Sequence, residues 1–324
     1  MATVQPAMFC RTEHWERCAT LRATGWWLLM LCVLALTACR KEPEVIGGNQ
    51  APNYEGVPTV LVENYVNRLF IDLLGREPLD AEMSAEVGAL EAAGLSMSAR
   101  SALVQKVMTS TAFLADDSSY RNKFCTRLYE LSKARFLEGV SDEVIDGFIG
   151  NAQQQALADS LGGNTSGLNA ANTTLGRLLA LKRSRTDLRD GLIGITEMMR
   201  RMVLNAVYDE IHMNSFNYVN ATFDNLLLRY PTDAEFDIAY AMVEQNTAGV
   251  LFGQSGQNKG EYAALVSAST EAREGLVRWS YVTFMGRLPD TGETVSAMDA
   301  LGPSTDIEDL LLRILITDEY ANLN

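Results

Sequence analysis

Apolar side chains recur at spacings of three and four residues from about residue 58 onward. The clearest stripe lies in the segment 62–74 and comprises Val62, Tyr65, Val66, Leu69, Phe70, Leu73 and Leu74. This spacing places them on one face of a helix. Long runs of alternating apolar and polar residues, which half-buried strands require, do not occur. The pattern therefore predicts an all-α fold.

Three of these stripes end in a similar motif. The stretches read LGREPLDAEM at 74–83, LLRYPTDAEF at 227–236 and MGRLPDTGET at 285–294. Glycine just past a helix end adopts the left-handed conformation, and proline prevents the helix from continuing. Each motif is therefore predicted to be a structural corner between two helices. The corner residues are Arg76, Pro78, Glu82, Arg229, Pro231, Glu235, Arg287, Pro289 and Glu293.

The start of the helix after each corner is also visible. In the second and third copies, Thr232 and Asp290 stand three residues before a glutamate. This spacing predicts a capping box, in which the two side chains satisfy free N–H groups of the new helix. The first copy has Leu79 at the cap position, so Asp80 is expected to cap that helix one residue later.

The stretches YVNRLFIDLLGREPLDAEM and YVNATFDNLLLRYPTDAEF carry a resemblance to a known family. They resemble the short helical repeat of unknown function found in bacterial surface and secreted proteins. The same Gly-Arg-x-Pro corner is found in phycobilisome linker polypeptides and in planctomycete proteins associated with cytochrome-like domains. The resemblance covers about half of the chain. It implies a helical interaction or scaffold module without catalytic residues.

The corners divide the chain into helical-hairpin repeats, predicted to pack into one or two helical domains. A middle region, 119–213, is helical but shows no clear copy of the motif. Its segment 162–174, GGNTSGLNAANTT, is almost uncharged and rich in turn formers, which predicts a loop. The predicted boundaries are 58–118 for the first repeat unit, 119–213 for the middle region, 214–274 for the second unit and 275–324 for the third.

The N-terminal residues have the layout of a bacterial secretion signal. An uncharged apolar stretch at 26–38 follows three arginines and is too short to span a bilayer as a helix. The tetrapeptide Leu-Thr-Ala-Cys at 36–39 resembles a lipobox, which implies a signal peptide at 1–38 and lipidation at Cys39. A chance cysteine beside an ordinary cleavage site is the alternative. Residues 39–57 are punctuated by Pro, Gly and Asn and are expected to form a lipidated tether.

The lipid on Cys39 would attach the protein to a membrane. Arg40, rather than an aspartate, follows the cysteine, so the expected location is the bacterial outer membrane, on either its periplasmic or its outer face. The formal net charge of −14 argues against nucleic acid as a partner, because nucleic-acid binding relies on basic side chains that neutralise phosphates.

Residues that could carry chemistry are few. After the predicted signal peptide, His212 is the single histidine; Asp209 lies on the same helical face, but no third metal ligand follows at a legible spacing. Cys125 lies on an apolar helical face and is expected to be a buried thiol. Phosphate-binding loops and a serine-nucleophile elbow are lacking. We therefore expect no metal, no cofactor and no enzymatic activity.

The sequence thus predicts a non-catalytic, membrane-anchored lipoprotein that serves as a scaffold or protein-binding module in a cell-envelope assembly. An envelope protein is the expected partner. Two alternatives stay open. One is a polysaccharide- or peptidoglycan-binding protein that uses exposed aromatic side chains. The other is a hydrolytic envelope protein that uses two carboxylates, since glycoside hydrolysis needs only a pair of acids at a set separation.

Overall fold

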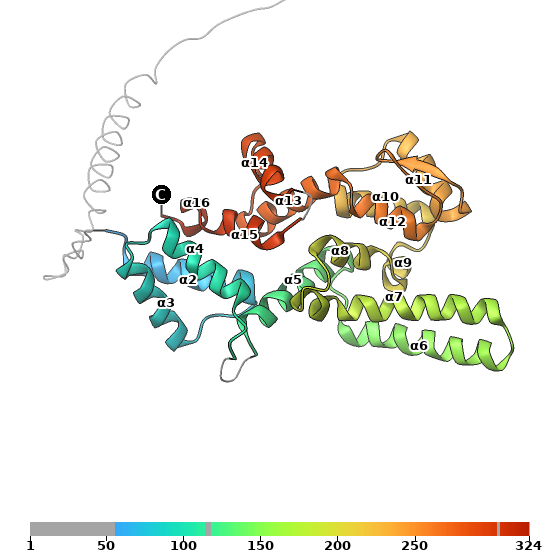
Figure 1. Ribbon diagram of the computed structural model, residues 1–324, viewed down its shortest axis with the longest axis horizontal. Coiled ribbons are helices and arrows are strands. Elements are labelled where there is room, and N and C mark those ends of the chain that lie inside the picture. Colours follow the sequence, from blue (N-terminus) through green and yellow to red (C-terminus); the bar gives the residue numbers. More distant parts are fainter. Residues whose placement is uncertain (1–55, 114–117, 303–304, 324) are drawn as a thin grey trace, which may run out of the picture. The chain divides into compact units, whose positions relative to one another are not determined.

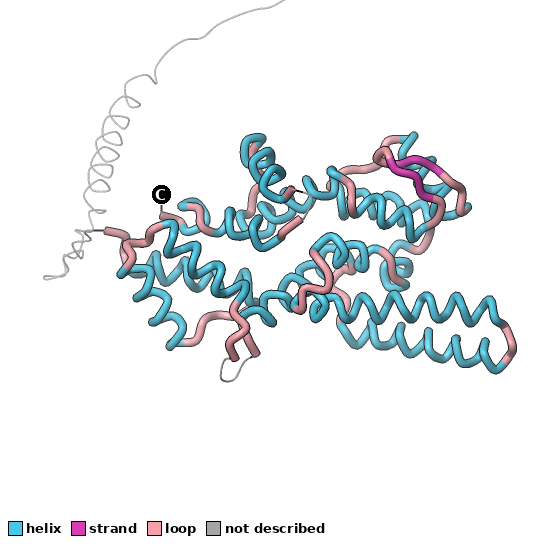
Figure 2. The backbone as a smooth tube through the Cα atoms, viewed as in Figure 1, coloured by secondary structure: helices cyan, strands magenta, loops and turns pink. Residues whose placement is uncertain are grey.

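The computed structural model describes residues 56–113, 118–302 and 305–323. Within these ranges the chain is all-α, as its hydrophobic periodicity predicts, with fifteen helices and one short hairpin of two strands (Figure 1, Figure 2). Residues Glu55–Asn324 form one compact unit. The predicted signal peptide, Cys39 and nearly all of the tether lie outside the described residues.

The helices fall into short groups joined by tight turns. The first seven are α2 (Thr59–Leu74), α3 (Asp80–Ala92), α4 (Met97–Thr109), α5 (Tyr120–Phe136), α6 (Asp142–Leu161), α7 (Thr165–Arg189) and α8 (Ile195–Val203). The remaining elements are α9 (Ala206–His212), α10 (Ser215–Leu227), α11 (Asp233–Gln245), β1 (Gly249–Leu251), β2 (Gln254–Gly256), α12 (Lys259–Ser267), α13 (Thr270–Met285), α14 (Thr291–Leu301), α15 (Ile307–Leu315) and α16 (Asp318–Ala321).

Helix α2 shows how the sequence pattern becomes structure. All seven residues of its apolar stripe are buried. Each buried side chain of this size stabilises the fold by roughly 1.5–3 kcal/mol, so the stripe fixes which face of the helix turns inward. The helix ends at Gly75, which has a φ of 71° and donates its N–H to the carbonyl of Ile71.

The loop predicted at 162–174 is wrong for most of its length. Only Gly162, Gly163 and Asn164 form the turn, and α7 begins at Thr165. The side chain of Asn164 accepts a hydrogen bond from the N–H of Gly167 at 3.1 Å and so caps the new helix. Helices α6 and α7 pack along each other (Figure 1). This packing overrides the weak helix preference of the Asn, Ser and Thr residues.

Segments from the two ends of the sequence meet at α2. The hydroxyl of Tyr320, in α16, donates to Asp72 at 2.8 Å, and the hydroxyl of Tyr65 donates to the carbonyl of Leu315 at 3.2 Å. The guanidinium of Arg68 lies over the ring of Tyr320 and donates to its carbonyl at 2.9 Å. We call this set of contacts the α2 joint.

A matching set of contacts joins α10 to the middle region. The hydroxyl of Tyr218 donates to the carbonyl of Val203 at 2.9 Å, and the amide of Asn225 donates to the hydroxyl of Tyr208 at 3.0 Å. Val203 ends α8 as Leu315 ends α15. We call this set the α10 joint. The middle region, predicted to lack a copy, thus repeats a contact made by the last two helices, although it has no Arg-x-Pro corner.

Candidate functional site

The three predicted corners share one arrangement of side chains. In each corner the arginine donates two parallel hydrogen bonds to the glutamate six residues later, over distances of 2.7–2.9 Å. Such bidentate pairs are the strongest form of charge-assisted hydrogen bond between side chains. The proline lies between the paired residues and separates the two helices. The paired residues are Arg76 with Glu82, Arg229 with Glu235 and Arg287 with Glu293.

The glutamates also cap the helices that follow. Each accepts a hydrogen bond of 2.8 Å from the backbone N–H of the cap residue, which is Leu79, Thr232 or Asp290. Thr232 and Asp290 complete the predicted capping boxes by accepting from the N–H of the glutamate. The expectation that Asp80 caps the first copy is wrong. Leu79 holds the cap position without a side-chain acceptor, and its own N–H donates to Glu82.

In each corner, the arginine or the glutamate hydrogen-bonds to a side chain in the first turn of a later helix. The Nε of Arg229 donates to Glu271 at 2.7 Å, and the Nε of Arg287 donates to Glu319 at 2.6 Å. At the first corner the contact runs through the carboxylate instead, which accepts from the hydroxyl of Tyr120 at 2.8 Å. The corners therefore connect helices as well as turning the chain.

This environment keeps the corner carboxylates ionised. Hydrogen bonds from Arg229 lower the pKa of Glu235 to about 2, and the bonds from Arg287 lower the pKa of Glu293. A general acid must hold a proton near the working pH. Glu235, with a pKa of about 2, cannot do so, and the oxygen atoms of all three corner glutamates already accept hydrogen bonds. The corner acids are therefore suited to structure rather than to proton transfer.

The corners present one residue outward. The arginine of each corner donates to the carbonyl of the residue between it and the proline, at 2.8–3.1 Å. That residue is Glu77, Tyr230 or Leu288, and all three side chains are exposed. The backbone is thus held firmly while the side chain stays free. In the second and third corners, the presented side chain lines a groove.

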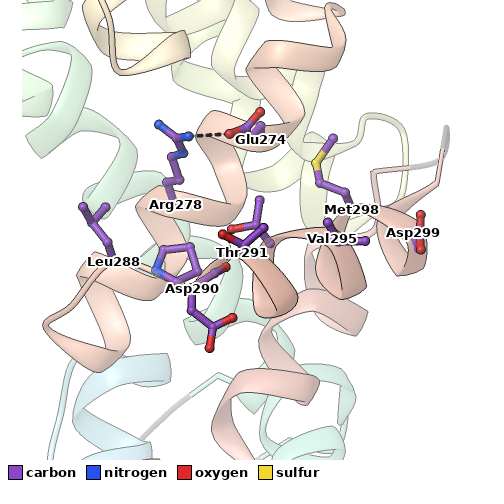
Figure 3. A pocket seen from close by; sticks show the side chains of 10 residues that line it. Glu274, Arg278, Leu288, Asp290, Thr291, Val295, Met298 and Asp299 are labelled. Atoms are coloured by element: carbon purple, nitrogen blue, oxygen red, sulfur yellow. Dashed lines mark hydrogen bonds and ion pairs between the residues drawn. The ribbon is translucent and has the colours of Figure 1, made fainter.

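The groove at the third corner lies between α13 and α14 and has a volume of about 610 Å³ (Figure 3). Leu288 and Val295 on its walls are both more than half exposed, and Met298 from α14 also lines it. The charged groups on the α13 side are Glu274 and Arg278, which pair with each other at 2.5 Å. The groove therefore offers apolar side chains beside this ion pair and beside the carboxylates of Asp290 and Asp299, which also line it.

A second groove, of about 520 Å³, runs along the outer face of α10. Phe216, near the start of α10, lines this groove. Tyr230, the exposed residue of the second corner, lines it as well. Its polar lining is formed by Asn217, Asn220 and Asp224 from α10, with His212 from α9. We call it the α10 groove.

The residues singled out for chemistry do not form a reactive set. The ring of His212 packs on Tyr208 with 4.2 Å between centroids, and burial lowers its pKa. Asp209, expected on the same face, pairs with Lys259 at 2.6 Å instead. Cys125 is buried, and burial raises its thiol pKa to about 11. Nucleophilic attack needs the thiolate, which such a thiol does not supply near neutral pH.

Sequence reasoning found the corner residues but missed the presented position and Phe216. One signal was available: an aromatic or aliphatic residue recurs between Arg and Pro at 230 and 288, although a corner of this kind faces solvent. The two grooves could not be predicted from the sequence, because each is completed by residues of another helix. That helix is α9 at the α10 groove and α13 at the groove of the third corner.

Within residues 56–113, 118–302 and 305–323, no group of three or more His, Cys, Asp or Glu side chains is arranged to hold a metal ion. The helices of these ranges include none that is both long and apolar enough to cross a membrane. Comparisons with protein families, with curated proteins and with solved structures find no match to this chain.

Proposed function

We propose that this chain is a non-catalytic lipoprotein of the bacterial outer membrane whose helical body binds a partner protein of the cell envelope. Lipid on Cys39 anchors the chain, and the tether 39–57 lets the body reach its partner. Lipidation with two or more chains gives stable anchoring, where one chain gives only marginal binding. The role of the body is to hold and position the partner.

The observation that carries this proposal is the groove between α13 and α14. Exposed apolar side chains that line a concave surface and are rimmed by polar groups are typical of protein-binding sites. The backbone of Leu288 is fixed there by the corner, so little backbone freedom is lost when a partner covers its side chain. The ionised, fully engaged corner glutamates support a role without catalysis.

A crosslinking pull-down from native membranes tests the proposal. The tagged full chain, Leu288→Asp and Cys39→Ser are each recovered in mild detergent after brief crosslinking, and co-purified proteins are quantified by mass spectrometry. We expect at least one envelope protein in stoichiometric amount with the wild type. Leu288→Asp should lose most of it, because a charge in the groove centre is costly to bury. Cys39→Ser should leave the membrane fraction.

Glu77→Asp is the matched control, since it changes the presented residue of the first corner, which does not line the groove between α13 and α14. It should recover the partner like the wild type. A wild-type protein that is recovered without any stoichiometric partner contradicts the proposal. So does a partner that Leu288→Asp retains in full.

A further inference from the structure

The α10 groove exists because one large side chain of the α2 joint has no counterpart in the α10 joint. When the two copies YVNRLFIDLLGR and YVNATFDNLLLR are aligned, Arg68 corresponds to Ala221. Arg68 fills the space beside Tyr320 and binds two carbonyl groups, those of Tyr320 and Phe284. At the α10 joint the small Ala221 stands at this position and lines the groove, and the ring of His212 packs on Tyr208, the counterpart of Tyr320.

The polar groups on the α10 groove are available to a ligand. Within the part of the chain that the structure describes, the side-chain amide of Asn217, the carboxylate of Asp224 and the hydroxyl of Tyr230 make no hydrogen bond or ion pair. Asn220 uses its amino group to donate to the carbonyl of Phe216 at 3.0 Å, which leaves its amide oxygen as an acceptor. The groove thus combines donors and acceptors that lie on one helical face.

Two aromatic rings complete the surface. Phe216 is 58% exposed and Tyr230 is 71% exposed. The ring of Phe216 packs against Phe236 with 4.9 Å between centroids, and Phe236 stacks on Tyr240. Arg229 fixes the backbone of Tyr230 by donating to its carbonyl. The ring of Phe216 and the backbone of Tyr230 are therefore held in place, while both rings are largely open to solvent.

These features together select a ligand chemistry. Backbone N–H and C=O groups of a helix are used internally, so the face of α10 offers no edge to which an extended peptide could add. Sugar hydroxyls both donate and accept, which matches amides, a carboxylate and a phenol. The apolar C–H faces of pyranose rings can cover exposed aromatic rings. The carboxylate of Asp224, which lines the groove, disfavours an anionic sugar.

We propose that the α10 groove is a binding site for an oligosaccharide of neutral sugars. Tyr230 and Phe216 stack on sugar rings, and Asn217, Asn220 and Asp224 hydrogen-bond to hydroxyl or acetamido groups. Ala221 provides the room that Arg68 occupies in the α2 joint. This site lies apart from the groove between α13 and α14, so it adds a ligand to the proposed scaffold and does not depend on the protein partner.

Glycan binding by the full chain tests the site. The protein is kept in a zwitterionic detergent without a sugar headgroup and is screened on an array of neutral and anionic oligosaccharides. Titration calorimetry then uses tetramers of N-acetylglucosamine and of glucose, which separate a peptidoglycan-like source from a hexose polysaccharide. We expect saturable binding of a neutral oligosaccharide, with anionic glycans bound more weakly.

Three variants locate the binding. Tyr230→Ala should weaken it about tenfold, which corresponds to about 1.4 kcal/mol. Ala221→Arg should abolish it by filling the groove as Arg68 fills the α2 joint. Leu288→Ala, at the same position of the third corner, should change the affinity by less than about twofold. Thermal melting by circular dichroism checks that each variant folds.

Three results would overturn the proposal. One is that no neutral oligosaccharide binds, on the array or in the titration. Another is that binding persists unchanged in both Tyr230→Ala and Ala221→Arg. The third is that a cationic peptide, tested alongside, occupies the groove and is lost in Tyr230→Ala while sugars do not compete with it.

Discussion

Leu79 is the residue at which the first corner departs from the other two. It stands where Thr232 and Asp290 accept a hydrogen bond from the following helix, and its side chain is 53% exposed. Leu79→Thr would supply the missing acceptor while removing little buried apolar surface. We expect the free energy of unfolding to rise by about 0.5–1 kcal/mol, measured by chemical denaturation.

Leu79→Ala is the control for the capping effect, because it removes the same side chain without adding an acceptor. The cap explanation predicts that Thr is more stable than both Leu and Ala at this position. If the Thr and Ala variants were equally stable, the first corner would not need a side-chain cap, and the bond from Leu79 N–H to Glu82 would suffice.

Glu235 gives a pH-dependent prediction at the same scale. Its pKa is lowered from 4.5 to about 2 by hydrogen bonds from Arg229, so folding favours the ionised form. The resulting stabilisation is fully present above about pH 4.5 and is lost as the pH falls through about 2. We expect Glu235→Gln to lower the free energy of unfolding by about 1 kcal/mol at pH 7, since the pair is partly exposed.

Denaturation at pH 7, 4 and 3 checks this expectation. The difference between wild type and Glu235→Gln should shrink at the two lower pH values, because the Glu235 carboxyl gains a proton in the unfolded chain there while it stays ionised in the folded protein. Glu77→Gln, at an exposed position without an ion pair, should match the wild type throughout. A deficit of Glu235→Gln that is constant from pH 7 to pH 3 would assign the effect to shape rather than to charge.

At the scale of elements, two helical glycines differ in the space around them. A Cβ on Gly275, in α13, would stand 2.0 Å from the carbonyl oxygen of Leu226 at the end of α10. Gly275→Ala should therefore destabilise the protein by about 2 kcal/mol or more, because the backbones must separate. A Cβ added to Gly176, in α7, would meet nothing within 4 Å. Gly176→Ala should stabilise by about 0.5–1 kcal/mol.

Thermal melting of both variants decides this comparison, since the two changes are chemically identical and both lie inside helices. Opposite shifts in melting temperature are expected. A loss of stability in both would mean that α7 needs its glycine for a reason other than space, and similar gains in both would contradict the close approach of α10 and α13.

The elements also show what the sequence can and cannot reveal. Local signals were sufficient for α2 and for the corner helices, because a periodic stripe, a proline and a capping glutamate all lie within a few residues. The start of α7 was missed because Asn, Ser and Thr signal turns locally, while its helix is stabilised by packing on α6. The α10 joint was missed because the middle region contributes Tyr208 and Val203 to it without an Arg-x-Pro motif. Contacts between distant elements leave no local pattern.

For the whole molecule, the two ends of the described chain depend on each other. Helices α15 and α16 pack on α4 and α2, and the hydroxyl of Tyr320 donates across 248 positions of the sequence to Asp72. Burial raises the pKa of Asp72, which shows that its carboxylate is costly to leave without a donor. The α2 joint therefore couples the stability of the first helix to that of the last.

Tyr320→Phe isolates this coupling because it removes the hydroxyl and keeps the buried ring. We expect a loss of about 1–2 kcal/mol and, in hydrogen-exchange mass spectrometry, faster exchange in both α2 and α15–α16. Phe113→Leu is the control, since it changes an exposed aromatic ring outside the α2 joint. If exchange rose in α16 alone while α2 kept its protection, the two ends would unfold independently, and the joint would be a contact without a role in cooperativity.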